Sequence, residues 1–177
     1  MIRSAGDFAP ETAANLRQSG WRILQLPAEL TLATLRQQGA PFRSDRYFKE
    51  FAGEVVETPT PACSIAYQPA LLAGSLNLRY EACEELIAEF NRSAPAACRA
   101  VIGQAAACVY VVNRHHEDTG SFPLAGAYCW TSDHYRDTHL VVGVFGRERP
   151  IIVAPLPEKQ GRGVGVMPLI VPIDFGF

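Results

Sequence analysis

The chain has 177 residues, of which 48% are hydrophobic and 19% are charged, and its formal net charge is −2. This length and apolar content predict one globular domain and exclude extensive disorder. The absence of excess positive charge argues against a nucleic-acid-binding protein, and no apolar stretch reaches the ~18 residues of a membrane span.

Cysteine usage indicates the redox environment. The chain has an odd number of cysteines without any C-x-x-C pair: Cys63, Cys83, Cys98, Cys108 and Cys129. This pattern argues against both a disulfide framework and a cysteine zinc site. We expect buried, reduced thiols in a cytoplasmic protein, and the first residues lack the apolar segment of a secretory signal.

Helix signals come early in the chain. Residues 7–20 predict a first helix, with Asp7 as a possible N-cap, Pro10 in the first turn and Gly20 at the end. Residues 21–26 form a short apolar run that predicts a strand.

A second helix is predicted over residues 27–39, from Pro27 to Gly39. Residues 44–51 can form a short helix. Residues 53–63 hold two prolines that break any central strand, so we expect a connector there.

The middle of the chain alternates between apolar runs typical of strands and the 3.6-residue apolar spacing typical of helices. Residues 63–69 and 98–103 predict short strands, whereas residues 77–95 predict a long amphipathic helix capped by Asn77. Residues 104–118 are ambiguous, because their valines favour a strand while their length, alanine run and following glycine favour a helix. We adopt the helix.

The pattern changes in the last third, which contains strand-like runs at residues 124–132, 138–146, 149–157 and 164–173. Their short connections allow antiparallel hairpins but not parallel crossovers. The sequence therefore predicts an α+β fold, with helices mainly in the N-terminal half packed on one face of a C-terminal antiparallel meander. Within one domain, residues 1–52 are an N-terminal helical part and residues 62–177 the main sheet-containing core.

The last of these runs is unusually apolar. It carries Pro168 and Pro172, which suit an edge strand rather than a central one. An exposed apolar edge is an aggregation risk, so a homodimer formed through this C-terminal edge strand is a hypothesis.

The loop Gln160-Gly161-Arg162-Gly163-Val164-Gly165 follows an apolar run and the pair Glu158 and Lys159. It resembles the pyrophosphate loop of the N-acetyltransferase superfamily, in which Gln or Arg precedes two residues, Gly, any residue, and Gly or Ala. The resemblance implies acetyl-coenzyme A binding by the backbone N–H groups from Gly161 to Gly165, at the start of a helix. The cofactor-binding residues would be Gln160, Gly161, Arg162, Gly163 and Gly165. Because the two prolines after the loop oppose a helix, a turn between strands is the alternative.

A second polar cluster lies near Cys129. Asp133, His134 and His139 can form an acid–base or metal cluster, and Cys129 with His134 can act as nucleophile and base. The alternatives are a hairpin turn built on Asp133 and Asp137, and a packed strand around Cys129.

Two adjacent histidines, His115 and His116, precede two acidic residues. Neighbouring residues of a helix point in different directions, so these histidines are not expected to chelate one ion, and a solvated helix end is the plain interpretation. The sequence predicts no metal site.

Three functional hypotheses remain open at this point. The first is a binding domain without catalytic activity, which holds a small ligand or a protein partner against the sheet. The second is an acyltransferase that uses acyl-coenzyme A at the glycine-rich loop. The third is a hydrolase or metal-dependent enzyme that uses Asp133, His134 and His139.

Overall fold

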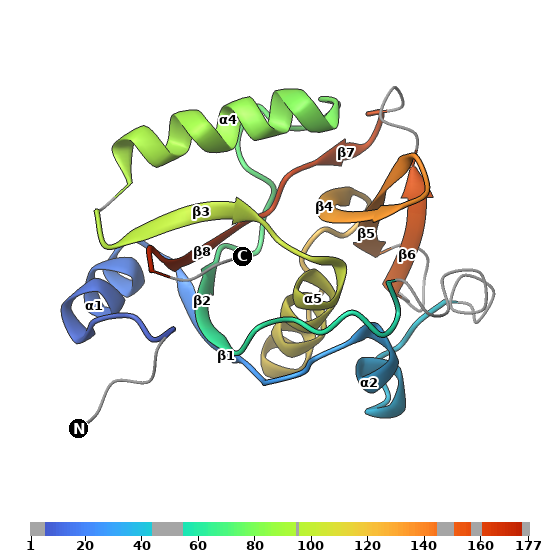
Figure 1. The fold of residues 1–177 in the computed structure, drawn as a ribbon, viewed down its shortest axis with the longest axis horizontal. Helices are drawn as coiled ribbons and strands as arrows, with labels where there is room; N and C mark the ends of the chain where they lie inside the picture. The colour runs from blue at the N-terminus through green and yellow to red at the C-terminus, as the bar shows by residue number, and fades with distance from the viewer. Residues whose placement is uncertain (1–5, 44–54, 95, 145–150, 157–160, 175–177) are drawn as a thin grey trace.

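The structure is a computed structural model, and it describes residues 6–43, 55–94, 96–144, 151–156 and 161–174. In these residues it holds two four-stranded sheets together with helices α1, α2, α4 and α5 (Figure 1). This combination confirms the α+β class. No described helix has the length and apolar character to cross a membrane.

The first sheet, sheet A, is antiparallel and has the strand order β1-β2-β8-β3. Its strands are β1 (Arg22–Leu26), β2 (Cys63–Tyr67), β8 (Pro168–Pro172) and β3 (Cys98–Ile102). Sheet A therefore joins the beginning, the middle and the end of the described chain.

The prediction that the C-terminal run is an edge strand is wrong, because β8 lies between β2 and β3. Pro168 and Pro172 are the first and last residues of β8, opposite Ile102 and Cys98 of β3. Their missing N–H groups fall at the ends of the ladder, and the three apolar residues between them are buried and paired. Both edges of β8 are thus occupied by the chain's own strands, so β8 offers no edge to a second copy.

The second sheet has the order β6-β5-β4-β7. The strands β4 (Tyr128–Tyr135), β5 (Thr138–Val144) and β6 (Ile151–Leu156) form the predicted antiparallel meander. The fourth predicted run, residues 164–173, is not part of the meander: its first residues form the short strand β7 (Val164–Gly165), which pairs in parallel with β4, and the rest forms β8 of sheet A. The glycine-rich loop is therefore not a hairpin turn, because the two strands that flank it lie at opposite edges of this sheet.

The hairpin between β4 and β5 also differs from expectation. Its turn consists of Arg136, which adopts φ +54°, and Asp137, whereas Asp133 lies inside β4. Asp133 was expected in the turn, but its carboxylate instead accepts a hydrogen bond of 2.7 Å from the backbone N–H of Ala105. That N–H is one of the groups left unpaired at the start of α5, so a side chain from the sheet satisfies the helix end.

The early helices form, but they begin later than predicted. α1 (Pro10–Gln18) is preceded by Ala9 without a side-chain cap, and Gly20 with φ +83° follows its end. Asp7, expected as the cap, accepts a hydrogen bond from the Ser64 hydroxyl instead.

α2 (Leu32–Gln37) starts after Thr31 rather than at Pro27. Thr31 and Thr34 form a reciprocal capping box, in which the Thr34 N–H donates to Thr31 Oγ1 over 3.0 Å. The possible short helix over residues 44–51 lies outside the described residues.

The two later helices are longer. α4 (Tyr80–Ser93) begins after Arg79, not at Asn77. The helix predicted over residues 104–118 is confirmed as α5 (Ala105–Thr119). It ends at Gly120, which has φ +70°. The left-handed glycine closes the helix, and the valines Val109, Val111 and Val112 are buried within it.

Helices lie on both faces of sheet A, whereas the sequence pattern alone places them on one. Alternate residues of its strands contribute to two different apolar clusters, one that includes α5 and one that includes α4. α5 is central, between sheet A and the second sheet, and α4 crosses the opposite side of sheet A (Figure 1). The Asn91 side chain of α4 pairs with both the N–H (2.6 Å) and the C=O (2.9 Å) of Ala100 on β3. This side chain therefore fixes α4 to the sheet edge.

Candidate functional site

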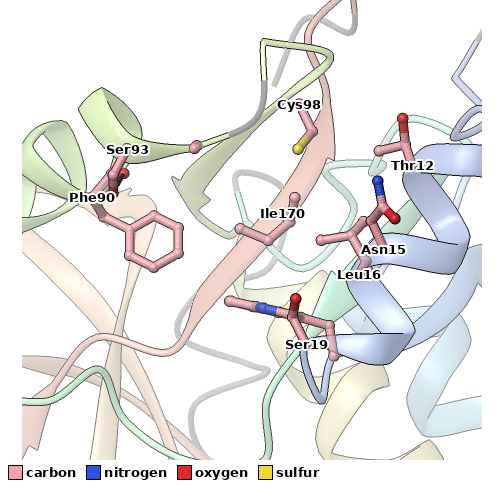
Figure 2. Close-up of a pocket in the computed structure, with 10 residues that line it drawn as sticks. Thr12, Asn15, Leu16, Ser19, Phe90, Ser93, Cys98 and Ile170 are labelled. Carbon is pink, nitrogen blue, oxygen red and sulfur yellow. Dashed lines mark hydrogen bonds between the residues drawn. The ribbon is translucent and has the colours of Figure 1, made fainter.

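A cleft of about 160 Å³ lies between α1 and α4, over the face of sheet A opposite α5. Figure 2 shows Leu16 of α1 and Phe90 of α4 on either side of Ile170 of β8. Most of its lining is apolar: Leu16, Trp21, Phe90, Ala94, Cys98 and Ile170. The cleft is therefore an apolar hollow whose floor is a sheet and whose walls are helices.

The walls of this cleft follow from the amphipathic pattern of the two helices. On α4, Cys83 and Ile87 are buried against sheet A, and Phe90 continues this stripe to the open end, where it is half-buried. Trp21 follows the end of α1, and its ring contacts that of Phe90 edge to face, with 6.1 Å between the ring centroids. This aromatic contact links the end of α1 to α4.

Four neutral polar side chains line the rim of the cleft: Thr12, Asn15, Ser19 and Ser93. Thr12 and Asn15 lie one turn apart on α1, and neither side chain has a hydrogen-bond partner among the described residues. The Ser93 hydroxyl donates to the Phe90 carbonyl over 2.9 Å, so only its lone pairs are left for a ligand. α1 therefore provides the unused donors and acceptors of the rim.

The cleft carries no formal charge on its described lining residues. The one ionisable group among them is the Cys98 thiol, and burial raises the pKa of this thiol above its ordinary value. Cys98 is therefore protonated at neutral pH. A ligand in the cleft meets apolar surface and neutral dipoles, with no opposite charge nearby to replace its own hydration.

The glycine-rich loop does not have the geometry that the acetyltransferase resemblance implies. Within the described residues, the Gly163 N–H donates to Asn77 Oδ1 (2.8 Å) and the Val166 N–H to Ser75 Oγ (3.1 Å). The Val164 N–H donates to the Gly161 carbonyl over 3.1 Å. These groups are used by the protein itself, and the loop leads into β7 and β8 rather than into a helix. Gln160 lies outside the described residues, and the Arg162 side chain is exposed.

The glycines of this loop have a packing role instead. A Cβ atom at Gly161 would lie 2.5 Å from the Leu78 carbonyl oxygen, and one at Gly165 would lie 2.7 Å from Ser75 Oγ. Real Cβ atoms do not approach other atoms so closely. The loop therefore needs glycine at these two positions because it packs directly on the segment that precedes α4.

His134 and His139 lie together, as the sequence suggested. They are opposite each other in the β4–β5 hairpin, with ring centroids 3.7 Å apart. His139 is buried and stacks on Tyr80 of α4 at 3.4 Å, and its Nδ1 lies 3.3 Å from the Thr131 carbonyl. Burial and the neighbouring His134 hold the pKa of His139 at about 4. Such an imidazole is a weak base at neutral pH.

Asp133 does not join this pair in the role expected of an acid–base carboxylate. Burial raises the pKa of Asp133, against the opposing effect of the Ala105 N–H. Its carboxylate accepts a hydrogen bond from the Ala105 N–H at the start of α5, so its interaction is with a helix end. The described residues contain no group of three or more histidine, cysteine or acidic side chains that could hold a metal ion.

Cys129 is a packed core residue. It is fully buried in the cluster around α5, whereas its neighbour Trp130 faces the other cluster, together with Tyr80 and His139. A hydrogen bond with Cys129, together with burial, raises the pKa of Cys108 well above its ordinary value. Cys129 and His134 are five positions apart on one strand, roughly 16 Å at the usual rise, so they do not form a nucleophile–base pair.

The structure reveals a buried polar network that the sequence did not suggest. The Tyr67 hydroxyl lies 3.1 Å from His115 Nδ1. Burial lowers the pKa of His115 and raises that of Tyr67, and the positive charge of Arg22 lowers the pKa of His115 further and opposes the rise at Tyr67. Both side chains are therefore neutral at pH 7, and the tautomer of the imidazole decides which of them donates. His115 is buried, so it does not belong to a solvated helix end. It follows Val111 by four residues and Val112 by three, and this helical spacing from two apolar residues was the sequence signal for its burial.

His116 is only partly buried, and its ring stacks on Phe122 at 3.7 Å. The two adjacent histidines of α5 thus have separate surroundings. The residues of the cleft were also missed, because they come from distant segments that sheet A brings together.

The chain matches no protein-family model, and no curated protein or solved structure is significantly similar to it. Function therefore has to follow from the geometry of the described residues.

Proposed function

We propose that the protein is a binding domain without catalytic activity, which holds a small and largely apolar ligand against sheet A in the cleft between α1 and α4. The observation that carries this proposal is the lining of the cleft, where an aromatic pair and aliphatic side chains form the hollow and neutral polar side chains line its rim. Ligand sites in proteins are typically apolar hollows with a few polar groups that orient the ligand.

The surroundings of the enzyme candidates also favour binding over catalysis. Within the glycine-rich loop, the Gly163 N–H donates to Asn77 and the Val164 N–H to the Gly161 carbonyl. Asp133 is engaged with the start of α5. The low pKa of His139 removes most of its strength as a base at neutral pH. Each group is thus explained by a structural contact within the fold.

We include a cytoplasmic location in this proposal. All five cysteines are buried and unpaired by disulfides. Free thiols persist in reducing compartments, which supports this part of the proposal.

The two tryptophans provide a test with an internal control. Trp21 lines the cleft, whereas Trp130 is buried elsewhere and donates its indole N–H to the Leu78 carbonyl over 3.1 Å. A panel of small neutral rings, coenzymes and nucleotides is added to protein with ¹⁵N-labelled indoles. We expect some of the neutral rings to shift the Trp21 resonance and leave that of Trp130 in place.

A pair of variants on α1 separates binding in the cleft from binding elsewhere. Thr12→Phe places a ring in the cleft and should abolish the shift of Trp21, whereas Ala14→Phe adds the same ring at an exposed position that does not line the cleft. The proposal is wrong if no member of the panel shifts Trp21, or if Thr12→Phe and wild type respond alike.

A further inference from the structure

We infer that the cleft selects one class of ligand, an uncharged six-membered ring that carries a single hydroxyl group, as in phenols. This inference rests on the proposed function and adds the size, charge and orientation of the ligand.

The size of the ligand follows from the volume of the cleft. At about 160 Å³ it is close to the roughly 150 Å³ of an apolar cavity that accepts benzene. One ring therefore fills the space between Leu16, Phe90 and Ile170, the three side chains that face one another in Figure 2. A nucleotide or a coenzyme is much larger and would have to remain mostly outside.

The charge of the ligand follows from the neutrality of the lining. A carboxylate or an ammonium group that enters the cleft loses its hydration, and the described lining provides neither a basic nor an acidic side chain to replace it. A hydroxyl group loses much less hydration free energy on entering the cleft, since one or two neutral hydrogen bonds replace its contacts with water. The cleft therefore discriminates against ionised rings of equal size.

The orientation of the ligand follows from the rim. The Asn15 carboxamide both donates and accepts, and the Thr12 hydroxyl lies one turn before it on the same helix. The opposite rim, on α4, offers only the lone pairs of Ser93. The ring consequently lies against the apolar floor with its hydroxyl group directed to α1, and Asn15 determines the preference for that group.

The test compares three probes of similar size, namely phenol, toluene and benzoate, at pH 7.4. Dissociation constants come from the Trp21 indole resonance in wild type, Asn15→Ala and Gln18→Ala. Gln18 is an exposed amide on the same helix that does not line the cleft, so it is the matched control. Because alanine favours a helix more than asparagine does, Asn15→Ala keeps α1 intact, and an unchanged Trp130 resonance verifies the fold.

We expect phenol to bind most tightly and benzoate most weakly. Asn15→Ala should weaken phenol between about threefold and tenfold, the usual contribution of one hydrogen bond, and leave toluene unchanged. Gln18→Ala should behave as wild type with all three probes.

Equal binding of phenol and toluene, tighter binding of benzoate, or a phenol-to-toluene ratio unaffected by Asn15→Ala would each overturn this inference and leave the proposed function intact. If none of the three probes shifts Trp21, the inference is also overturned, and the wider panel of rings decides the proposed function separately.

Discussion

Acidification should destabilise the fold, and the buried His139 should have a larger share of this effect than His115, because the pKa of His139 is lowered to about 4. This imidazole is only 3% exposed, lies between Tyr80 of α4 and His134 of β4, and has Glu81 of α4 as its nearest acidic influence. Burial and His134 lower its pKa from 6.5 to about 4, and the Thr131 carbonyl and Glu81 oppose this only partly. The folded protein therefore resists a proton that the unfolded chain accepts.

The sign and size of the effect follow from this difference. Between pH 6.5 and 4 the unfolded chain binds a proton at this position and the folded protein does not, so the free energy of unfolding falls as the pH falls. The stabilising contribution is complete above pH 6.5. A shift of one pKa unit corresponds to about 1.36 kcal/mol, which sets an upper limit near 3 kcal/mol. Because solvent reaches the exposed His134 beside it, we expect a loss of about 2 kcal/mol.

Urea denaturation followed by circular dichroism at several pH values between 7 and 4 measures this loss. The reference is His139→Phe, which keeps a flat ring on Tyr80 but cannot bind a proton. The difference in unfolding free energy between wild type and His139→Phe removes the titration of all other groups. It should decrease by about 2 kcal/mol from pH 7 to pH 4.

A matched control is His134→Gln, which replaces the exposed member of the pair and should keep most of the pH dependence. A difference between wild type and His139→Phe that stays constant to within about 0.5 kcal/mol across this range would refute the reasoning.

Two further predictions concern the glycine-rich loop and the start of α5. Gly161→Ala should lower the free energy of unfolding by about 2 kcal/mol or more, because the new Cβ meets the Leu78 carbonyl. Gly163→Ala, at φ +76° in open space, should lower it by about 1 kcal/mol. Urea denaturation measures both, and equal losses would contradict the packing role of Gly161. Asp133→Ala should lower the free energy of unfolding by about 1–2 kcal/mol, because it leaves the Ala105 N–H without its acceptor, and Asp133→Asn should retain most of this stability. Equal losses for the two variants in thermal denaturation would argue against a stabilising hydrogen bond from Asp133 to the start of α5.

Local patterns in the sequence were sufficient for most elements of the fold. The length, the alanine run and the closing Gly120 favoured a helix for α5 although its valines favoured a strand, and the helix is confirmed. Short connections predicted the meander of β4, β5 and β6. Helix starts were less predictable. Thr31 was missed as the cap of α2 because its partner is another threonine, Thr34, and not the more common acidic residue.

Features that depend on tertiary pairing could not be read from local patterns. Nothing in the sequence around Pro168 indicates that β8 inserts between two strands that lie far earlier in the chain. The same limit applies to the cleft, where Asn15, Trp21, Phe90 and Ile170 are brought together only by sheet A and its helices. The one local sign of the cleft in the sequence was an aromatic residue near the end of each helix, Trp21 after α1 and Phe90 in α4.

The central position of β8 also constrains how the chain is made. During synthesis from the N-terminus, β2 and β3 leave the ribosome long before Pro172, and until then neither can pair along the edge that β8 later occupies. Sheet A is therefore completed only after translation has passed residue 172, and two unpaired strand edges are held open in the meantime. In the nascent chain these edges therefore lack their native partner until the last strand arrives.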